Sequence, residues 1–198
     1  SCIFGKEMWE QQLTELFISQ SLDEALANGE ICVWFQPQYD FATGRMCGAE
    51  ALCRWTHHAM GWISPAEFIP VLERTGQIVK LDRYVWEESC KYMRRWRNAK
   101  TMLPISVSVN VSRMEMGEGN LVDRLNMLTD KYSLPHSALR LEITETGYMN
   151  EPEVLIEAVN DLHDNGYTVE MDDFGSGFSS LNMLKDVTVQ HNFFYSPY

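Results

Sequence analysis

Short strand-like runs alternate with helix-like runs from residue 31 onward, and this alternation limits the fold more than any other feature. Strands are predicted at 31–38, 46–55, 105–111, 139–144 and 167–171, and helices at 65–73, 78–96, 121–131 and 151–165. Because helices separate most of the consecutive strands, the pattern predicts an α/β fold with a parallel sheet and crossover helices. Such a sheet is either open or closed into a barrel.

Strand periodicity separates an apolar face from a polar face. In the run 105–111 the valines alternate with Ser108 and Asn110, and in 139–144 leucine and isoleucine alternate with Glu142. Successive side chains of a strand point to opposite faces, so each run has one face of each kind. If the apolar faces pack on outer helices, the polar faces point into a barrel, where functional groups gather at the C-terminal strand ends.

Acidic and amide side chains lie in or at the ends of these strands, namely Glu50, Asn110, Glu142, Asp172 and Asp173. A buried carboxylate needs a cation or another partner. An all-oxygen ligand set favours magnesium or manganese over zinc. The adjacent pair Asp172-Asp173 could bridge to a second ion, an arrangement used in phosphodiester hydrolysis.

Each acid also has a plain structural explanation. Glu142 could pair with Arg140 or Arg54, and Asp172 could cap the turn that follows it. Arg54 shares a strand face with Glu50 and Leu52, so a salt bridge to Glu50 is open as well.

Composition narrows the class of protein. The chain has 198 residues, of which 45% are hydrophobic and 22% charged, values that are ordinary for one globular domain. Its net charge of −12 works against binding to DNA. We expect no membrane span, because no apolar run approaches about 18 residues. The five cysteines lack a C-x-x-C spacing and are expected to be free thiols in a reducing cytoplasm.

The first 28 residues divide, by pattern, into two helices. The segment 3–20 has helical apolar spacing and is either a connector to an upstream domain or an ordinary packed helix. Ser21 and Glu24 then have the spacing of a capping box, and Gly29 ends the second helix. We therefore expect a connector helix at 1–20 and a new domain at 21–198.

Six motifs occur in the order and with the spacing of one known family. Together they resemble the EAL family of cyclic-di-GMP phosphodiesterases, from about residue 21 to 189. They are Gln36-Pro-Gln-Tyr-Asp, Glu50-Ala-Leu-Cys-Arg54-Trp, Ile63-Ser-Pro-Ala-Glu-Phe-Ile-Pro, Ser108-Val-Asn110-Val-Ser, Glu142-Ile-Thr-Glu145 and Asp172-Asp-Phe-Gly-Ser-Gly-Phe-Ser-Ser180. The Glu-Ala-Leu triplet alone would carry no weight. The resemblance implies a TIM-like (β/α) barrel of the EAL type.

The resemblance also implies a role for each matched residue. Glu50, Asn110, Glu142 and Asp172 would bind a first Mg²⁺ or Mn²⁺ ion, and Asp173 would contribute to a second. Glu50, Asp172 and Asp173 would thereby form the catalytic centre.

Other matched positions would hold the substrate. Gln36, Leu52 and Arg54 would bind cyclic-di-GMP, and Glu145 would anchor the loop after Asp173. The implied reaction is attack by a metal-activated water on one phosphodiester, giving linear pGpG. A homodimer is expected, together with an upstream GGDEF or sensor domain that could anchor a longer protein to a membrane.

The chain departs from the family near its end. Where the family has an Asp-x-x-Lys-x-Asp run, the sequence has Gln190, Phe193 and Tyr195, so the lysine that helps to position water is missing. About six of the eight strands of such a barrel fit into this length, which predicts an incomplete barrel with an exposed edge. The missing lysine and strands therefore count against enzymatic activity of this chain.

Three other functions compete with the phosphodiesterase. One is an inactive cyclic-di-GMP-binding module, and another is a protein-interaction module that pairs through its open edge. A magnesium-dependent enolising barrel has suitable ligands but explains neither Asp172-Asp173 nor the Gly-Ser loop that follows.

The adjacent histidines and the tryptophans are the last side chains with a predicted location. We expect His57 and His58 to be solvated loop residues, because adjacent loop residues rarely bind one ion together. The tryptophans, including Trp34, Trp55 and Trp96, are expected in the core, whereas Trp62 lies beside the predicted site and is left open.

Overall fold

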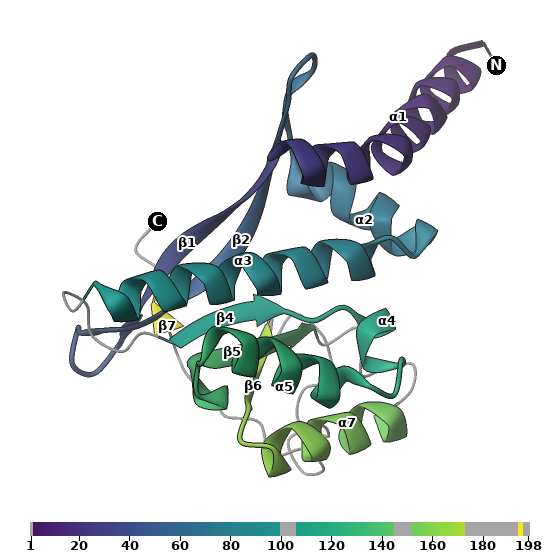
Figure 1. Cartoon of the computed structure of the whole chain (residues 1–198). Coiled ribbons are helices and arrows are strands. Elements are labelled where there is room, and N and C mark those ends of the chain that lie inside the picture. The colour runs from purple at the N-terminus through teal and green to yellow at the C-terminus, as the bar shows by residue number, and fades with distance from the viewer. Residues whose placement is uncertain (1, 100–105, 145–151, 173–193, 196–198) are drawn as a thin grey trace.

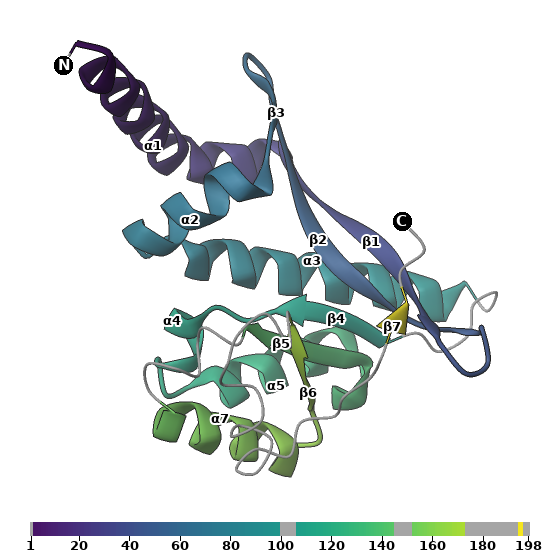
Figure 2. The same ribbon diagram turned by 180° about the vertical axis from the view of Figure 1, so that it is seen from behind.

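One mixed sheet organises the chain, and helices α3, α5 and α7 cover one of its faces (Figures 1 and 2). The computed structural model describes residues 2–99, 106–144, 152–172 and 194–195. The described elements follow in the order α1 (Cys2–Asn28), β1 (Ile31–Asp40), β2 (Met46–His57), β3 (Gly61–Ile63), α2 (Pro65–Thr75), α3 (Ile78–Asn98), β4 (Ser106–Asn110), α4 (Arg113–Met116), α5 (Leu121–Tyr132), the 3₁₀ turn η1 (His136–Ala138), β5 (Leu139–Thr144), α7 (Pro152–Asp164), β6 (Thr168–Asp172) and β7 (Phe194–Tyr195).

The strand order is β6-β5-β4-β2-β1-β7, with β3 paired to β2. Strands β2, β4, β5 and β6 are parallel, as predicted, but β1 and β2 form an antiparallel hairpin. A parallel sheet with crossover helices was predicted, and this pair of strands departs from it because the connection 41–45 is too short for a crossover. Asp40 closes this turn, since its Oδ1 accepts a hydrogen bond from the Thr43 backbone N–H at 2.7 Å.

The hydrophobic core lies between the sheet and the helices. On β4 and β5, Val107, Val109, Leu139 and Leu141 are all fully buried at 0% exposure. These are the residues that the period-two pattern placed on the apolar face. The apolar faces therefore pack into the core between the sheet and the helices, which is the condition under which the polar faces point away from the helices.

Helix α1 is one continuous helix where two separate helices were expected, meeting at Ser21. Ile18, Leu22 and Ala25 are buried in the core at a spacing of four and three residues, which continues one helical face past Ser21. Burial of this continuous face outweighs the local capping signal, so the predicted break at Ser21 was wrong. Gly29, with φ of 72°, ends the helix as expected.

Four short elements were missed because each is too brief to show periodicity: β3, α4, η1 and β7. Strand β7 pairs antiparallel with the far end of β1, placing Tyr195 opposite Tyr39. Strand β7 thus covers the Tyr39–Asp40 end of the β1 edge. Among the residues that the structure describes, no helix has the length and apolarity that crossing a bilayer requires.

Four of the cysteines are described, and all are free thiols: Cys32, Cys47, Cys53 and Cys90. Burial raises the pKa of Cys53 to about 11 and that of Cys90 to about 12. Both groups therefore remain protonated and unreactive near neutral pH. The expected absence of disulfides holds for these four residues.

Candidate functional site

Strand register brings the oxygen-bearing residues of β2, β4 and β5 onto one face of the sheet. Glu50 is the partner of Ser108, two residues before Asn110, and Asn110 is the partner of Glu142. Partners on neighbouring strands present their side chains on the same face. Glu142 is buried at 7% exposure, whereas Glu50 and Asn110 are half-buried. Three of the predicted ligands thus lie on neighbouring strands and are offset along the sheet by no more than two residues.

The fourth predicted ligand lies at the end of the next strand. Asp172 is the last residue of β6, and its backbone is aligned with Thr144 of β5. The carboxyl ends of β4, β5 and β6 therefore meet at the same edge, as in other barrel-type sites. Asp173 and Glu145, also predicted site residues, lie outside the described residues.

Helix α3 holds the β4 end of this site in place. The Trp86 indole N–H donates to the Asn110 carbonyl oxygen at 2.9 Å, and the Ser112 backbone N–H donates to Asp82 Oδ2 at 2.9 Å. The Val111 backbone N–H donates to the Glu142 carbonyl at 2.9 Å, which ties β4 to β5. Burial raises the pKa of Asp82 to about 7.

A buried polar network lies on the same sheet face, towards the amino ends of the strands. Arg140 Nη1 donates to Glu170 Oε1 at 2.9 Å, and the Ser108 hydroxyl donates to Glu170 Oε2 at 2.7 Å. Arg140 also donates to the Gln38 side-chain oxygen. All four side chains are no more than 7% exposed.

The alternation along the strands contains a signal for this network. Alternation put Arg140 on the polar face together with Glu142, and Gly48 lies on the same face of β2. A Cβ atom at Gly48 would lie 2.2 Å from Arg140 Nη2, so only glycine leaves room for the guanidinium. Arg140 forms its ion pair with Glu170, a partner that the sequence analysis did not consider.

The predicted substrate residues line β1 and β2 beside the carboxylates. Gln36 is the register partner of Glu50, and Leu52 and Arg54 continue the same face of β2. Arg54 Nη1 donates to the Cys53 carbonyl at 2.9 Å. Among the ion pairs of the described residues, none joins Arg54 to Glu50.

The donor set suits a hard divalent cation. Glu50 and Glu142 supply carboxylate oxygens and Asn110 supplies an amide oxygen, with neither sulfur nor imidazole among them. These residues come from three adjacent strands, so the sheet positions them independently of any loop.

A second group with metal-binding residue types, Glu30, His57 and His58, lies at the open end of the β1–β2 hairpin, opposite the turn 41–45. His57 Nδ1 accepts the Ala59 and Met60 backbone N–H groups at 3.1 and 3.2 Å. A neutral His57 therefore carries its proton on Nε2, the atom that faces Glu30 at 3.9 Å. This tautomer has no lone pair on Nε2 for a cation.

The structure contradicts the expectation that both histidines are solvated loop residues. His57 is buried at 8% exposure, with the Phe17 ring of α1 edge-on at 4.8 Å, so it is not solvated. His58 is exposed, and its Nδ1 lies 2.5 Å from Glu30 Oε1. That hydrogen bond lowers the pKa of Glu30.

The tryptophans divide into two groups. Trp55 is fully buried and Trp96 packs against the core, as predicted. Trp34 is 61% exposed, so its predicted place in the core was wrong. It follows Val33 on β1, and strand alternation turns it away from the helices. Trp62 is 53% exposed.

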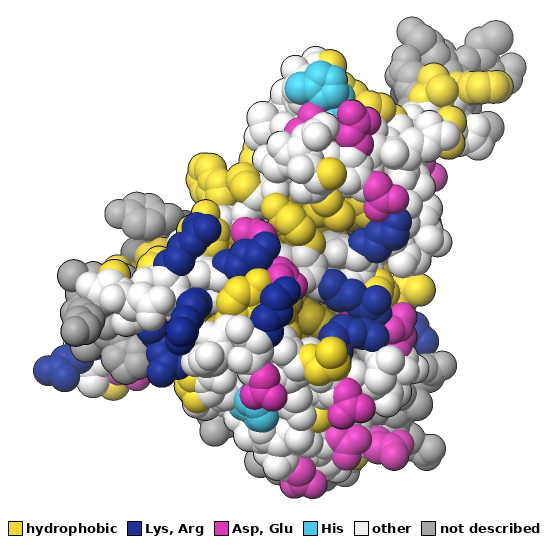
Figure 3. Space-filling view, viewed as in Figure 1, with side chains coloured by type: hydrophobic (Ala, Val, Ile, Leu, Met, Phe, Trp, Pro, Cys, Tyr) yellow, Lys and Arg dark blue, Asp and Glu magenta, His cyan; other side chains and the backbone are white. Residues whose placement is uncertain are grey.

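Lysine and arginine side chains gather over α3 and its neighbours despite the net negative charge (Figure 3). Several are paired with carboxylates: Lys80 with Asp23 at 2.7 Å, Lys131 with Glu87 at 2.7 Å, and Arg83 with both Glu115 and Glu118. These pairs neutralise much of the positive charge on the helical face.

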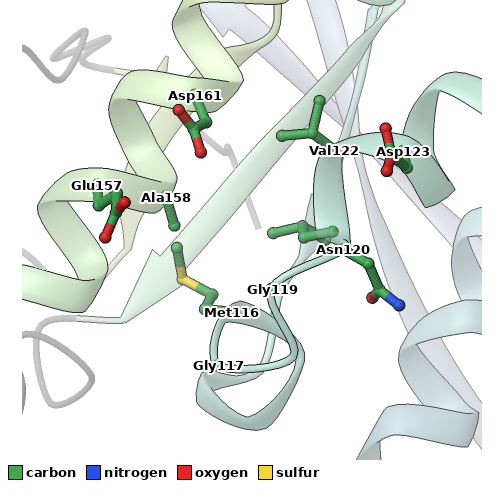
Figure 4. Close-up of a pocket in the computed structure, with 10 residues that line it drawn as sticks. Met116, Gly117, Gly119, Asn120, Val122, Asp123, Glu157, Ala158 and Asp161 are labelled. Atoms are coloured by element: carbon green, nitrogen blue, oxygen red, sulfur yellow. The ribbon is translucent and has the colours of Figure 1, made fainter.

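A cavity of about 370 Å³ lies in the outer helical layer (Figure 4). The α4–α5 connection lines one side of it, with Gly119 and Asn120, and α7 lines the other, with Glu157 and Asp161. No strand residue lines this cavity among the described residues, so it is separate from the carboxylate site on the sheet.

Comparison with known proteins points to one family. A family model described as EAL domain matches residues 19–191. The bifunctional diguanylate cyclase/cyclic di-GMP phosphodiesterase MucR of Pseudomonas aeruginosa is 33% identical over 184 residues, which cover 93% of this chain and 27% of MucR. The oxygen sensor protein DosP of Escherichia coli is 31% identical, over 94% of this chain and 23% of DosP. The chain thus spans about a quarter of the length of these curated relatives.

Solved structures give the same result. A cyclic-di-GMP complex of the MucR phosphodiesterase matches with a TM-score of 0.81 and 33% identity, covering 88% of this chain and 70% of that structure. The EAL enzyme Bd1971, with cAMP and cyclic-di-GMP bound, matches with a TM-score of 0.80 and 26% identity, covering 90% of this chain and 49% of that structure. The TIM-barrel-like fold expected from the motifs is confirmed.

Proposed function

Because this chain belongs to the EAL domain family, we propose that it binds cyclic-di-GMP and hydrolyses one phosphodiester to give linear pGpG. The observation that carries the proposal is the register of β2, β4 and β5. It aligns Glu50, Asn110 and Glu142 on one sheet face, in the chain order of the family motifs. MucR, a relative of 33% identity, is named as a cyclic di-GMP phosphodiesterase.

The site residues would hold Mg²⁺ or Mn²⁺. Glu50, Asn110, Glu142 and Asp172 would bind one ion, and Asp173 would contribute to a second. When bound, a divalent cation lowers the pKa of a neighbouring water and neutralises charge on phosphate oxygens. The contacts of α3 with β4 support this assignment, since they fix the strand end that presents Asn110.

The remaining predicted residues act on the substrate. Gln36 and Leu52 would contact the dinucleotide from the same strand face as Glu50. Arg54 would supply a planar fork of N–H donors to a phosphate of the dinucleotide. Glu145 would anchor the loop that carries Asp173.

Binding without cleavage is the second candidate function. It is favoured by the sequence after Lys185, where Gln190, Phe193 and Tyr195 replace the family's Asp-x-x-Lys-x-Asp run. Such a protein would keep the ligands for metal and nucleotide without the lysine that positions water.

Chromatography of cyclic-di-GMP incubated with the purified chain and Mg²⁺ or Mn²⁺ separates the two functions. The phosphodiesterase predicts pGpG, and it predicts that Glu50→Gln lowers the rate by about 10²-fold or more. The matched control is Glu157→Gln, an exposed acid on α7 away from the site, which should leave the rate unchanged. Binding with no pGpG supports the second function, and neither binding nor product rejects both.

Assembly is proposed on separate grounds. We propose a cytoplasmic homodimer in which α1 connects this domain to an upstream GGDEF or sensor domain. Trp9, Leu13 and Leu16 support a packing role for α1, because they are 65%, 57% and 53% exposed along one helical face. Size-exclusion chromatography with light scattering of Leu13→Gln tests this role, since a monomeric mass is expected only if the stripe forms the contact.

A further inference from the structure

Two buried side chains of α3 hold the end of β4 that carries Asn110. The Trp86 indole N–H donates to the Asn110 carbonyl oxygen, and Asp82 Oδ2 accepts a hydrogen bond from the Ser112 backbone N–H, both at 2.9 Å. Trp86 is 1% exposed and Asp82 is 6% exposed, so water does not compete for either bond. The two bonds therefore fix the backbone at Asn110 and directly after it.

The spacing along the helix matches the spacing along the strand end. Asp82 and Trp86 are four residues apart on α3, a rise of about 6 Å. Asn110 and Ser112 are two residues apart in extended backbone, a span of about 6.6 Å. Because α3 runs antiparallel to β4, the earlier helix residue meets the later strand-end residue. Two matched attachment points restrain both the position and the direction of the backbone, which one point would not do.

The sheet restrains Asn110 on one side only. In the described register, pairing of β4 with β2 ends at Ser108, opposite Glu50, whereas pairing with β5 continues to Asn110, opposite Glu142. Trp86 thus supplies a partner for the Asn110 carbonyl where the β2 ladder has ended.

We propose that Asp82 and Trp86 are positioning residues for the metal site, holding the Asn110 amide beside the Glu142 carboxylate. This inference rests on the proposed function and adds to it two residues that set the affinity for the ion. A ligand side chain on a fixed backbone loses less conformational freedom when a cation binds. Groups that orient metal ligands from behind typically change metal affinity by about tenfold to a hundredfold.

A second buried tryptophan shows that core packing alone does not require such a bond. Trp55 on β2 is 0% exposed, and its indole N–H has no hydrogen-bond partner among the described residues. The core of this protein therefore accommodates an indole N–H that bonds nothing. Trp86 differs from Trp55 in directing its N–H to the backbone of a predicted metal ligand.

Calorimetric titration of the full chain with Mn²⁺ tests the role of Trp86. Trp86→Phe keeps an aromatic ring but removes the N–H, and it should weaken Mn²⁺ binding by about tenfold to a hundredfold. The matched control is Trp55→Phe, which makes the same chemical change at a buried indole without a hydrogen bond, and its Mn²⁺ affinity should equal that of the native chain. Circular dichroism verifies that both variants are folded under the titration conditions.

A pair of variants at Asp82 tests the second attachment point independently. Asp82→Leu removes the acceptor for the Ser112 N–H, and it should weaken Mn²⁺ binding by about tenfold or more. Asp82→Asn keeps a side-chain oxygen for that N–H and should retain most of the affinity. A merely structural role would lower the urea midpoint of Asp82→Leu but leave the Mn²⁺ affinity of its folded form unchanged.

The outcomes distinguish the positioning role from the proposed function. Equal Mn²⁺ affinity within a pair of variants rejects the role of that residue, and the phosphodiesterase stands if the native chain still forms pGpG. If the variants lose affinity as expected but the native chain forms no pGpG, hydrolysis is rejected and the positioning role stands. If the native chain binds no Mn²⁺, or if Asn110→Ala binds it unchanged, the metal site and the positioning role are both rejected.

Discussion

On the helix-facing side of the sheet, Val107, Val109 and Leu141 are 0% exposed; on the opposite side, Arg140 and Glu170 are 6% and 5% exposed. Both faces are therefore buried, but by different interactions. The first face is held by hydrophobic contact, which depends on shape and volume. The second is held by an ion pair and hydrogen bonds, which depend on every partner being present. Burial alone thus does not indicate what a substitution will cost.

The largest expected effect is the loss of one partner on the polar face. Arg140→Met leaves Glu170 charged in a buried site, and we expect a loss of about 3–5 kcal/mol in the free energy of unfolding, measured by urea denaturation. The double variant Arg140→Met/Glu170→Met removes both charges and should recover part of that loss, because Ser108 and Gln38 still lose their partners. If the double variant is no more stable than the single one, the buried ion pair does not account for the difference.

A cavity on the apolar face should cost somewhat less. Leu141→Ala removes a fully buried side chain of β5 and is expected to lower the free energy of unfolding by about 2–5 kcal/mol. The matched control is Met127→Ala on α5, where the side chain is 74% exposed, with an expected change within about 0.5 kcal/mol. Equal losses in the two variants would contradict the assignment of the core to this face.

Overpacking the polar face is the third test. Gly48→Ala places a methyl group against Arg140 Nη2 and near the Ser106 carbonyl, with an expected loss of about 1–3 kcal/mol. Gly117→Ala is the control, because its added methyl group would meet only ordinary contacts at 3.7 and 3.8 Å. Thermal denaturation of both variants measures their losses of stability. If Gly48→Ala is the milder change, the close contact between Gly48 and Arg140 does not limit the residue at this position.

The last test concerns pH, and its effect is small at each pH unit but accumulates across several units. Burial raises the pKa of Asp82 to about 7, from 3.8. A raised pKa means that folding favours the neutral form of Asp82. The contribution of Asp82 to the free energy of unfolding is therefore complete below about pH 4 and is lost as pH rises to about 7. The stability of the native chain minus that of Asp82→Asn should therefore fall by about 1 kcal/mol per pH unit across this window.

Urea denaturation at several pH values measures this difference. Asparagine keeps a side-chain oxygen for the Ser112 N–H but does not titrate. A flat Asp82→Asn difference would show that Asp82 titrates normally.

Sequence reasoning succeeded where one period extends over a whole element. The strand Leu139–Thr144 was predicted with its observed bounds, and the long helix at 78–96 was found as Ile78–Asn98. Alternation also placed Asn110 and Glu142 on one face, which the register bears out. It failed at Ser21, where continuous burial along α1 overrides a local capping signal, and at Trp34, whose place on the polar face was not read from the pattern.

The sequence by itself determined the order of strands and helices, the apolar and polar faces of each strand, and the family to which the chain belongs. These follow from periodicity and motif spacing, which are local properties of the chain. Only the tertiary structure decided which polar residues become partners: Arg140 with Glu170 rather than a nearer carboxylate, and Arg54 with Trp34 and Trp62 rather than Glu50. Partner choice depends on the register and connection of strands far apart in the sequence, which local patterns do not specify.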